Sequence, residues 1–212
     1  MTEVQARHDV TTVYREMGRR GLIAGSSGNV SQRTRKGMII TPSGGSAEVL
    51  APDGVVAMTL AGDVKGSVAP SSEWAMHAAI YLAYPSAQSI VHTHSDACTA
   101  LACLNEGLPP FHYMVADFGG DDVRCAPYVT FGTPELARLA VAALAGRTAC
   151  LLANHGMIVH APTANRALTA AVVLETLCRQ YLLARSAGTP RLLSAEEMRA
   201  AHQRYRTYGQ RA

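Results

Sequence analysis

A short β-branched run at residues 90–94, Ile-Val-His-Thr-His, constrains the fold of this chain more than any other stretch. Strand side chains alternate between faces, so His92 and His94 point the same way, about two rises of ~3.3 Å apart. Two imidazoles at this spacing can converge on one metal ion, with each Zn–N bond at ~2.0–2.1 Å. Asp96 then begins a helix-like segment, which places the pair at a strand's C-terminal end, where ligand sites occur in α/β folds. The alternative is a strand whose histidines only bond to neighbours, since H-x-H is a weak pattern, and a third ligand has to come from elsewhere.

Length and charge limit the class of protein. With 212 residues the chain suits one large domain, or at most two small ones, and can bury a sizeable core. The net charge is only +3, and the basic residues are scattered without aromatic interleaving, which argues against a nucleic-acid partner. The N-terminal residues lack the apolar region of a signal peptide, and no apolar run approaches the ~20 residues that span a bilayer. We therefore expect a cytoplasmic protein with no membrane partner.

The cysteines also favour a reducing compartment. They are five in number and form no C-x-x-C pair, which argues against a disulfide framework. Four of them lie within apolar runs, so buried free thiols are expected. The five are Cys98, Cys103, Cys125, Cys150 and Cys178.

Helical periodicity and capping signals predict the helices. Thr133 followed by Pro134 is typical of a helix start, and Thr163 caps a later, longer helix. Ser194 and Glu197 form a capping box for the last helix. In chain order, helices are expected over residues 4–20, 72–84 with Ser72 as the N-cap, 96–105, 133–146, 163–187 and 194 to about 208–209.

Short apolar runs predict the strands. Candidates are residues 38–40, 55–58, 90–94, 150–153 and 157–159, and the last two are separated by the turn Asn154-His155-Gly156. Residues 111–131 are expected to form short strands and turns, with candidate segments at 111–114 and 128–131. Since no internal repeat or linker is present, this order predicts one α/β domain with a central mixed sheet and helices on its faces.

The turn between two of these strands offers the third imidazole. His155 is the best candidate, because three histidines with an open fourth position are typical of a catalytic rather than a structural metal site. The other histidines lie on expected helices or beside prolines and aromatic residues, and we interpret them as ordinary surface or core residues. They are His8, His77, His112, which is the least certain, His160 and His202.

Small residues offer donors suited to a phosphate. They are the glycine-rich turns at residues 25–29 and 43–45, and Ser71-Ser72 at a helix start. None matches a Walker A loop or a dinucleotide-binding motif, and each alone is more often a plain turn or cap. The adjacent Glu73 either favours the helix dipole in the first turn or serves as a fourth metal ligand or a general acid/base.

Together these stretches resemble the class II aldolase/adducin family over nearly the whole chain. Stretches shared widely in that family are Gly25-Ser-Ser-Gly-Asn-Val-Ser31, Ile40-Thr-Pro-Ser-Gly44, Pro70-Ser-Ser-Glu-Trp74, Val91-His-Thr-His94 and Leu151-Leu-Ala-Asn-His-Gly156. More particular to the branch that cleaves fuculose phosphate are His112-Tyr-Met114, Cys125-Ala-Pro-Tyr128 with Thr130-Phe-Gly-Thr133, and Arg206-Thr-Tyr-Gly209.

The resemblance implies a fold, a reaction and an assembly. The expected fold is a single domain over residues 1–212 with a mixed, largely antiparallel sheet flanked by helices, and a mobile C-terminal tail from about residue 204. The expected activity is that of a zinc-dependent aldolase, which cleaves a ketose 1-phosphate such as L-fuculose 1-phosphate into dihydroxyacetone phosphate and L-lactaldehyde. The family also implies one Zn²⁺ per subunit and a C4 homotetramer with sites at subunit interfaces.

The family's metal and proton-transfer roles fall on particular residues here. The resemblance implies that His92, His94 and His155 hold Zn²⁺, while Glu73 completes the resting coordination and then moves protons.

The substrate-binding roles follow in the same way. Tyr113 of a neighbouring subunit would act at the aldehyde end, Tyr208 on the tail would assist it, and Phe131 would line the aldehyde pocket. The phosphate would be held by Ser26, Asn29, Ser43, Gly44, Ser71 and Ser72.

Departures from the family pattern leave the aldehyde half open. Asn154 stands where the fuculose enzyme has a histidine, residues 95–96 are Ser-Asp, and Ser27 replaces a smaller apolar residue. Related aldolases act on 5-deoxyribulose 1-phosphate or 5-methylthioribulose 1-phosphate, and an apolar pocket discriminates one methyl group or hydroxyl by only ~1–3 kcal/mol.

Two other functions on the same fold compete with the aldolase. A sugar-phosphate epimerase acting on L-ribulose 5-phosphate is the nearest, but such epimerases resemble Ser-Ser-Asp where this chain has Ser-Ser-Glu. A non-catalytic adducin-like module is disfavoured, because it would be expected to lose the metal ligands that this chain retains.

Overall fold

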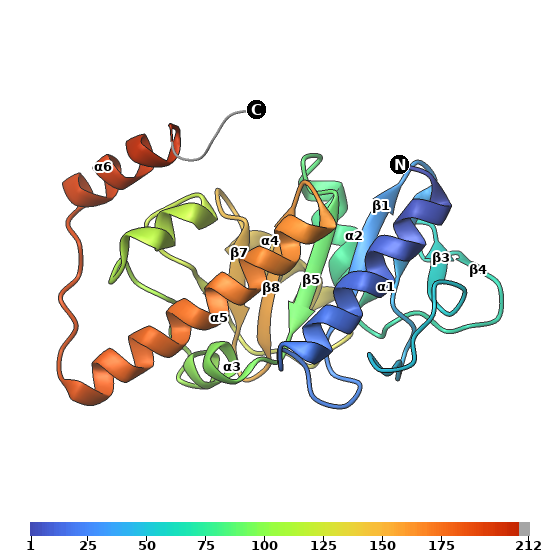
Figure 1. The fold of residues 1–212 in the computed structure, drawn as a ribbon, viewed down its shortest axis with the longest axis horizontal. Coiled ribbons are helices and arrows are strands. Elements are labelled where there is room, and N and C mark those ends of the chain that lie inside the picture. Colours follow the sequence, from blue (N-terminus) through green and yellow to red (C-terminus); the bar gives the residue numbers. More distant parts are fainter. Residues whose placement is uncertain (208–212) are drawn as a thin grey trace.

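One mixed sheet runs through the centre of the molecule (Figure 1). The computed structural model describes residues 1–207, and within them eight strands follow the order β4-β3-β2-β1-β5-β8-β7-β6. Neighbouring strands are antiparallel except for β6 and β7, which are parallel. The strands are β1 (Asn29–Thr34), β2 (Gly37–Ile40), β3 (Val56–Met58), β4 (Val64–Lys65), β5 (Ser89–Thr93), β6 (Cys125–Ala126), β7 (Ala149–Leu152) and β8 (Gly156–Ala161).

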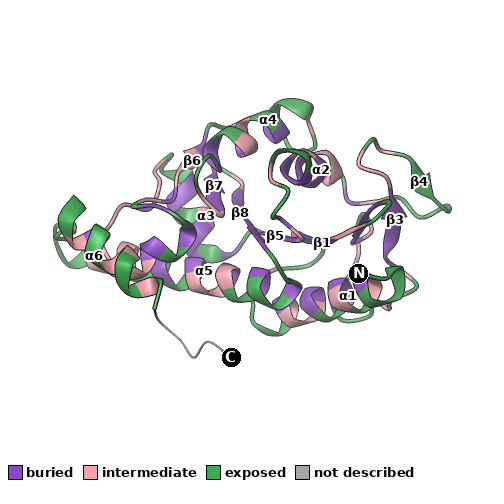
Figure 2. Ribbon diagram, turned by 90° about the horizontal axis from the view of Figure 1, so that it is seen from above, coloured by how far each residue is buried: buried purple, intermediate pink, exposed green. Residues whose placement is uncertain are grey.

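Helices cover both faces of this sheet. Figure 2 shows α1 and α5 along one side and α2 and α4 along the other, with the strands between them. The predicted single α/β domain with a largely antiparallel sheet flanked by helices is therefore confirmed. The helices are α1 (Glu3–Arg19), α2 (Trp74–Ala83), α3 (Asp96–Cys103), the 3₁₀ helix η1 (Tyr113–Phe118), α4 (Pro134–Ala143), α5 (Ala164–Ala187) and α6 (Ala195–Tyr205).

The alternation of the central strand β5 creates two hydrophobic cores. Val91 belongs to the core beneath α1, α3 and α5, whereas Ile90 belongs to the core beneath α2 and α4. All five residues of β5 are buried, as expected for a strand covered on both faces. His92 shares the parity of Ile90, so its side chain points toward the layer that contains α2.

The long helix α5 is a core helix. By length and composition alone, this 24-residue helix is apolar enough to cross a membrane. In the structure, Leu168, Leu174 and Leu177 of this helix are buried in the core beneath α1 and α3. The apolar face of α5 is thus used to cover the sheet.

Four local predictions were wrong. Ser72 is not the N-cap of α2, because the Ser71 hydroxyl accepts the backbone N–H of Glu73 at 3.3 Å and the helix begins after Glu73. Residues 111–114 are not a strand, since the His112 ring accepts the backbone N–H of Met114 at 3.2 Å and caps η1. Residues 128–131 are likewise irregular, and the last helix ends at Tyr205 rather than near residues 208–209, which lie outside the described chain.

Two glycines allow the strands on either side of β5 to approach its C-terminal end. Gly28, just before β1, has φ +74°, and a Cβ there would lie 2.7 Å from the carbonyl oxygen of His92. Gly156 begins β8, where a Cβ would collide with the carbonyl oxygen of Thr93. Both neighbouring strands therefore pack tightly around the segment that carries the histidine pair.

We expect Gly156→Ala to destabilise the protein by about 1–3 kcal/mol, because the collision is with backbone and cannot be relieved by a side-chain rotation. Gly188→Ala is the matched control, since a Cβ at Gly188 meets no atom within 4 Å. Urea denaturation followed by circular dichroism measures both. Equal stability of the two variants would contradict this account of the β5–β8 contact.

Candidate functional site

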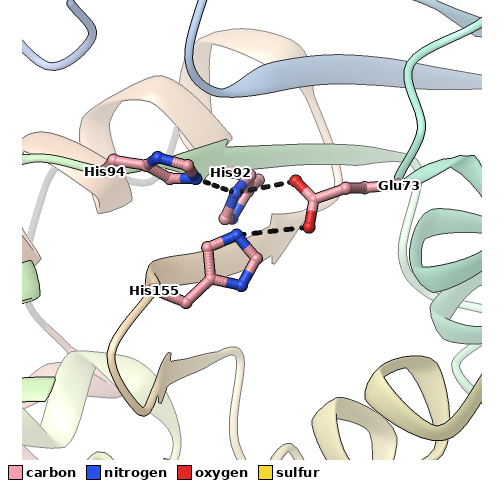
Figure 3. Close-up of side chains that lie close together, drawn as sticks. All are labelled: Glu73, His92, His94 and His155. Atoms are coloured by element: carbon pink, nitrogen blue, oxygen red, sulfur yellow. Dashed lines mark hydrogen bonds and ion pairs between the residues drawn. The ribbon is translucent and has the colours of Figure 1, made fainter. Parts of the chain in front are cut away.

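Three histidines and one glutamate converge at the C-terminal end of β5 (Figure 3). The ligand atoms of Glu73, His92, His94 and His155 all lie within 4.8 Å of one another. Their imidazole ring centroids are 4.8–4.9 Å apart, with interplanar angles of 72–75°. Rings in this mutual arrangement surround a common point, as ligands of one ion do.

Different elements deliver these four side chains. His92 comes from β5, His94 follows that strand directly, and His155 lies in the turn of the β7–β8 hairpin. Glu73 is the N-cap of α2 on the same side of the sheet. Because β8 pairs with β5, with His92 opposite Ile158, the hairpin turn falls at the same end of the sheet as the histidine pair.

The hydrogen bonds of His92 show that the cluster fits a cation. Its Nδ1 lies 2.9 Å from the carbonyl oxygen of Met157, an acceptor only, so Nδ1 carries the proton and a neutral ring presents a lone pair at Nε2. That Nε2 is 2.9 Å from Glu73 Oε2, which is also an acceptor when ionised. Two facing lone pairs repel unless a cation, either a proton or a metal ion, lies between them. The donor set of three imidazoles and a carboxylate is one that divalent metals accept.

The charges of the cluster suit metal binding. Burial alone would raise the pKa of the Glu73 carboxyl, but His92, His155 and the Asn29 amide bring that pKa below its usual range, so the carboxylate is ionised. Burial, together with the nearby His92, lowers the pKa values of His94 and His155 to about 4. Both rings are therefore neutral at pH 7, the state in which imidazole binds a metal.

One oxygen of Glu73 is held and the other is not. Oε2 accepts a hydrogen bond from Asn29 Nδ2 at 3.1 Å. Oε1 is buried and has no hydrogen bond to any described residue, although His155 Nε2 lies 3.3 Å away. A buried carboxylate oxygen without a partner is a group that a metal or a substrate proton can reach.

The chain around His94 is anchored on both sides. The Thr93 hydroxyl donates to Ser95 Oγ at 3.0 Å, just before α3 begins. The buried carboxylate of Glu175 on α5 then accepts the backbone N–H groups of Ala97 and Cys98 at 2.9 and 3.0 Å. The bonds to Glu175 satisfy two of the free donors at the start of α3 and help to fix the backbone that follows His94.

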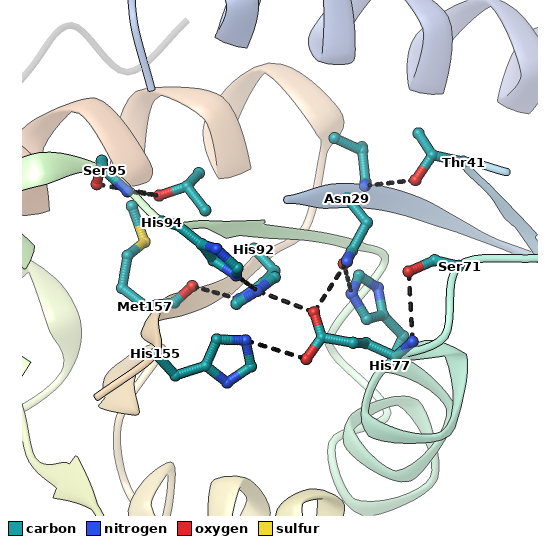
Figure 4. A network of polar contacts seen from close by, with 12 residues as sticks. Asn29, Thr41, Ser71, His77, His92, His94, Ser95, His155 and Met157 are labelled. Atoms are coloured by element: carbon teal, nitrogen blue, oxygen red, sulfur yellow. Dashed lines mark hydrogen bonds and ion pairs between the residues drawn. The ribbon is translucent and has the colours of Figure 1, made fainter. Parts of the chain in front are cut away.

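His77 was interpreted from the sequence as an ordinary residue, yet it lies two hydrogen bonds from the cluster. Figure 4 shows its ring beside the Asn29 amide, where Nε2 lies 2.6 Å from Oδ1. Its position four residues after Glu73 places both on one face of a helix, which was the available sequence signal. Burial lowers the pKa of His77 to about 3, so its ring is neutral at pH 7.

A cavity of about 380 Å³ adjoins the cluster. The structure brings every residue assigned to phosphate binding to the wall of this cavity. Ser26, Ser43 and Ser72 are exposed to it, whereas Asn29 and Ser71 are buried at its base. The residues are Ser26, Asn29, Ser43, Gly44, Ser71 and Ser72.

The remaining wall of the cavity is more apolar. Tyr128, Val129 and Phe131 line it, and the side chains of Tyr128 and Phe131 are largely exposed. Asn154, in the hairpin turn before His155, also contributes, with the left-handed φ of 53° that asparagine tolerates. Phe131, which the resemblance assigned to the aldehyde pocket, lines this cavity.

Tyr113, one of the two tyrosines assigned to catalysis, does not line this cavity. Tyr113 is on η1, where its ring stacks on His112 at 4.6 Å and tilts against Tyr205 at 6.4 Å. It is 54% exposed, so another molecule can reach it. Tyr208 lies outside the described residues, and its role stays a prediction.

Comparisons with known proteins agree with this geometry. The family described as "Class II Aldolase and Adducin N-terminal domain" matches residues 8–182. The 5-methylthioribulose-1-phosphate/5-deoxyribulose-1-phosphate aldolase of Rhodospirillum rubrum is 42% identical over 211 residues, covering 100% of this chain and 96% of the relative. The L-fuculose phosphate aldolase of Escherichia coli K12 is 41% identical over 197 residues, 92% of each chain. A solved L-fuculose 1-phosphate aldolase superposes with a TM-score of 0.91 and 36% identity, covering 95% of this chain and 96% of that one.

We expect the purified protein to bind one divalent metal per chain and to gain stability from it. At a free metal concentration 100 times the dissociation constant, the free energy of unfolding should rise by about 2.7 kcal/mol. His94→Ala should abolish stoichiometric binding, whereas His8→Ala, on the exposed face of α1, should bind as the parent does. Metal analysis and thermal unfolding measure both effects, and full occupancy in His94→Ala would contradict the assigned site.

Proposed function

Because the chain belongs to the class II aldolase and adducin family, we propose that it is a metal-dependent aldolase that cleaves a ketose 1-phosphate. The products would be dihydroxyacetone phosphate and a short aldehyde. The observation that carries the proposal is the buried Oε1 of Glu73, which has no hydrogen bond to any described residue. It lies beside three imidazoles at the base of a cavity with a hydroxyl-rich wall.

The reaction requires two proton movements. A proton leaves the hydroxyl on the carbon that becomes the aldehyde, and the electrons of the breaking carbon–carbon bond pass to the ketone half. A proton is then added to the carbon of the ketone half that was part of the broken bond, which gives dihydroxyacetone phosphate. Zn²⁺ held by His92, His94 and His155 would act as a Lewis acid and stabilise the negative charge that develops on the ketone half.

Glu73 is the residue placed to move these protons. Its pKa is held below the usual range, so the carboxylate is ionised at pH 7. Oε1 is the oxygen to which no described residue donates a hydrogen bond, so it is the one free to take a substrate proton. A positioned acid/base group of this kind contributes ~10²–10⁴-fold to a rate.

The other wall of the cavity is suited to the phosphate. Exposed hydroxyls of Ser26, Ser43 and Ser72 surround it, and Gly44 has the positive φ of 66° that brings backbone close to a ligand. Binding energy from a remote phosphate holds the reacting carbon in register with Glu73.

Aldehydes of two kinds are candidates for binding at the apolar wall. L-fuculose 1-phosphate would release L-lactaldehyde, which carries a hydroxyl, whereas 5-deoxyribulose 1-phosphate and 5-methylthioribulose 1-phosphate would release aldehydes with other end groups. The wall formed by Tyr128, Val129 and Phe131 favours an apolar end group. The relatives of both kinds are similarly close to this chain, at 42% and 41% identity.

A complete site would need a second copy of the chain. Tyr113 is exposed on η1 and does not line the cavity of its own chain, so we propose that it acts in the site of a neighbouring subunit within a homotetramer. We also propose a cytoplasmic location, which suits the five free cysteines.

We expect release of dihydroxyacetone phosphate from one of the three 1-phosphates, abolished by a chelator and restored by Zn²⁺. Glu73→Gln should lower kcat by ~10²–10⁴-fold, because the amide cannot accept a proton. Glu48→Gln, at an exposed site, is the matched control. A coupled dehydrogenase assay measures the release of dihydroxyacetone phosphate in each of these experiments. Conversion of L-ribulose 5-phosphate to its epimer without any such release would favour the epimerase instead.

A subunit-mixing experiment tests the shared site. Glu73→Gln and Tyr113→Phe homomers should each be weakly active, but their co-expression should restore activity to about a quarter of the parent, because random pairing gives that share of interfaces with both native residues. Co-purification through two different tags isolates the hybrids. Hybrids no more active than the average of the two homomers would show that Tyr113 does not act across an interface.

A further inference from the structure

Two rows of buried polar side chains face one another beneath the candidate site. Glu73, His77 and Tyr81 follow one face of α2 at intervals of one helical turn, and Asn29 and Ser31 follow one face of β1. All five are buried, with exposed fractions between 0% and 5%. Side chains so deeply buried are normally fully hydrogen-bonded.

The two rows alternate to form one continuous chain of hydrogen bonds. The Tyr81 hydroxyl lies 2.8 Å from Ser31 Oγ, and Ser31 Oγ lies 2.7 Å from His77 Nδ1. His77 Nε2 is 2.6 Å from Asn29 Oδ1 (Figure 4). Asn29 Nδ2 is 3.1 Å from Glu73 Oε2. The chain ends at the carboxylate of the metal cluster.

The carboxylate fixes the direction of every bond in this chain. An ionised Glu73 only accepts, so Asn29 must present its NH₂ group to Glu73 and its carbonyl oxygen to His77. His77 must then donate from Nε2. Since a neutral ring has a single N–H, Nδ1 accepts a hydrogen bond from the Ser31 hydroxyl. The Ser31 oxygen in turn accepts a hydrogen bond from the Tyr81 hydroxyl.

The orientation of the Asn29 amide is set by its neighbours and not by its own shape. An asparagine side chain has nearly the same shape after a 180° flip, and its neighbours decide which end is the donor. In the flipped state an oxygen would face the Glu73 carboxylate, and two acceptors would repel. Among the described residues, the group that opposes this flip from the other side is the His77 N–H.

We propose that His77 is a positioning residue which, through the Asn29 amide, holds the Glu73 carboxylate in place at the metal cluster. This inference rests on the proposed function where it concerns turnover, but the effect on the metal site is independent of the substrate. Residues that orient metal ligands in this way typically change metal affinity or activity by ~10–100-fold when replaced.

The first test compares His77→Leu, which removes the donor, with His77→Gln, whose amide N–H can replace Nε2–H. Co²⁺ is the probe, because its affinity and its visible absorption spectrum report the ligand field. We expect His77→Leu to weaken Co²⁺ binding by about tenfold or more and to alter the spectrum, with His77→Gln restoring most of both. Co²⁺ affinity and spectrum like those of the parent in folded His77→Leu would overturn the proposal.

A buried histidine elsewhere supplies the matched control. His160 on β8 is 6% exposed and stacks on Tyr84 at 5.2 Å. His160→Leu should lower the melting temperature without changing Co²⁺ affinity by more than about twofold, since it is not joined to the cluster. An equal loss of Co²⁺ affinity in His160→Leu and His77→Leu would show a general effect of destabilisation and would overturn the positioning role.

A double-mutant cycle separates positioning from other effects on turnover. If His77 acts through Glu73, His77→Leu should lower kcat by ~10–100-fold in the parent but by less than about twofold in Glu73→Gln. A full loss in both backgrounds would overturn the proposal. If the parent cleaves none of the 1-phosphates, the proposed function fails, while the Co²⁺ measurements still decide the role of His77.

The tautomer of His77 can be observed in the unmutated protein, which keeps the test valid even if His77→Leu does not fold. Nitrogen-15 NMR of labelled histidines should show His77 protonated at Nε2 and bare at Nδ1, with assignment through His77→Gln. Protonation at Nδ1 would mean that the Asn29 amide is oriented otherwise, and would overturn the proposal.

Discussion

The structure depends on the compensation of one buried negative charge. Glu73 is 5% exposed, and an ionised carboxylate so far from water is costly unless it is paired and hydrogen-bonded. One hydrogen bond from Asn29 and the nearby imidazoles supply part of that compensation, yet Oε1 keeps no hydrogen bond among the described residues. Because the negative charge is only partly compensated, the cluster is suited to a cation, and Oε1 is available for proton transfer.

The sheet order explains how residues so distant in sequence reach one point. β5 lies between β1 and β8, and both pair with it in antiparallel register. The end of β5 is therefore next to the start of β1 and next to the β7–β8 hairpin, which carry Asn29 and His155. Glu73 arrives from outside the sheet, at the start of a helix that packs on the same face as His92. Gly28 and Gly156 keep these segments close enough for the side chains to meet.

Patterns confined to one segment could be read from the sequence. Strand alternation gave His92 and His94 a common direction, and the capping signals at Thr133, Thr163 and Ser194 coincide with real helix starts. Signals that depend on contacts between segments could not be read in this way. Ser72 was predicted as the N-cap of α2, but Glu73 occupies that position, and its backbone N–H donates to the Ser71 hydroxyl.

His77 shows why the sequence understates such sites. Its spacing from Glu73 was visible, but its partners Ser31 and Asn29 lie 46 and 48 residues away and belong to a strand that was not itself predicted as an element. Its hydrogen bonds distinguish this ring from a packed core residue. Their direction is set only when Ser31 and Asn29 are in place.

The polar rows between α2 and β1 also connect stability with activity. An apolar version of this interface could hold the helix on the sheet equally well, since replacing buried polar networks by well-packed apolar groups is often neutral or stabilising. Apolar side chains cannot donate a hydrogen bond, however, so they would leave the Asn29 amide free to rotate. The network therefore orients side chains rather than strengthening the packing of α2 on the sheet. Each hydrogen bond fixes the donor and acceptor of the next one, as far as Glu73. A fully satisfied chain of this kind specifies one arrangement of the site, whereas a broken link leaves several.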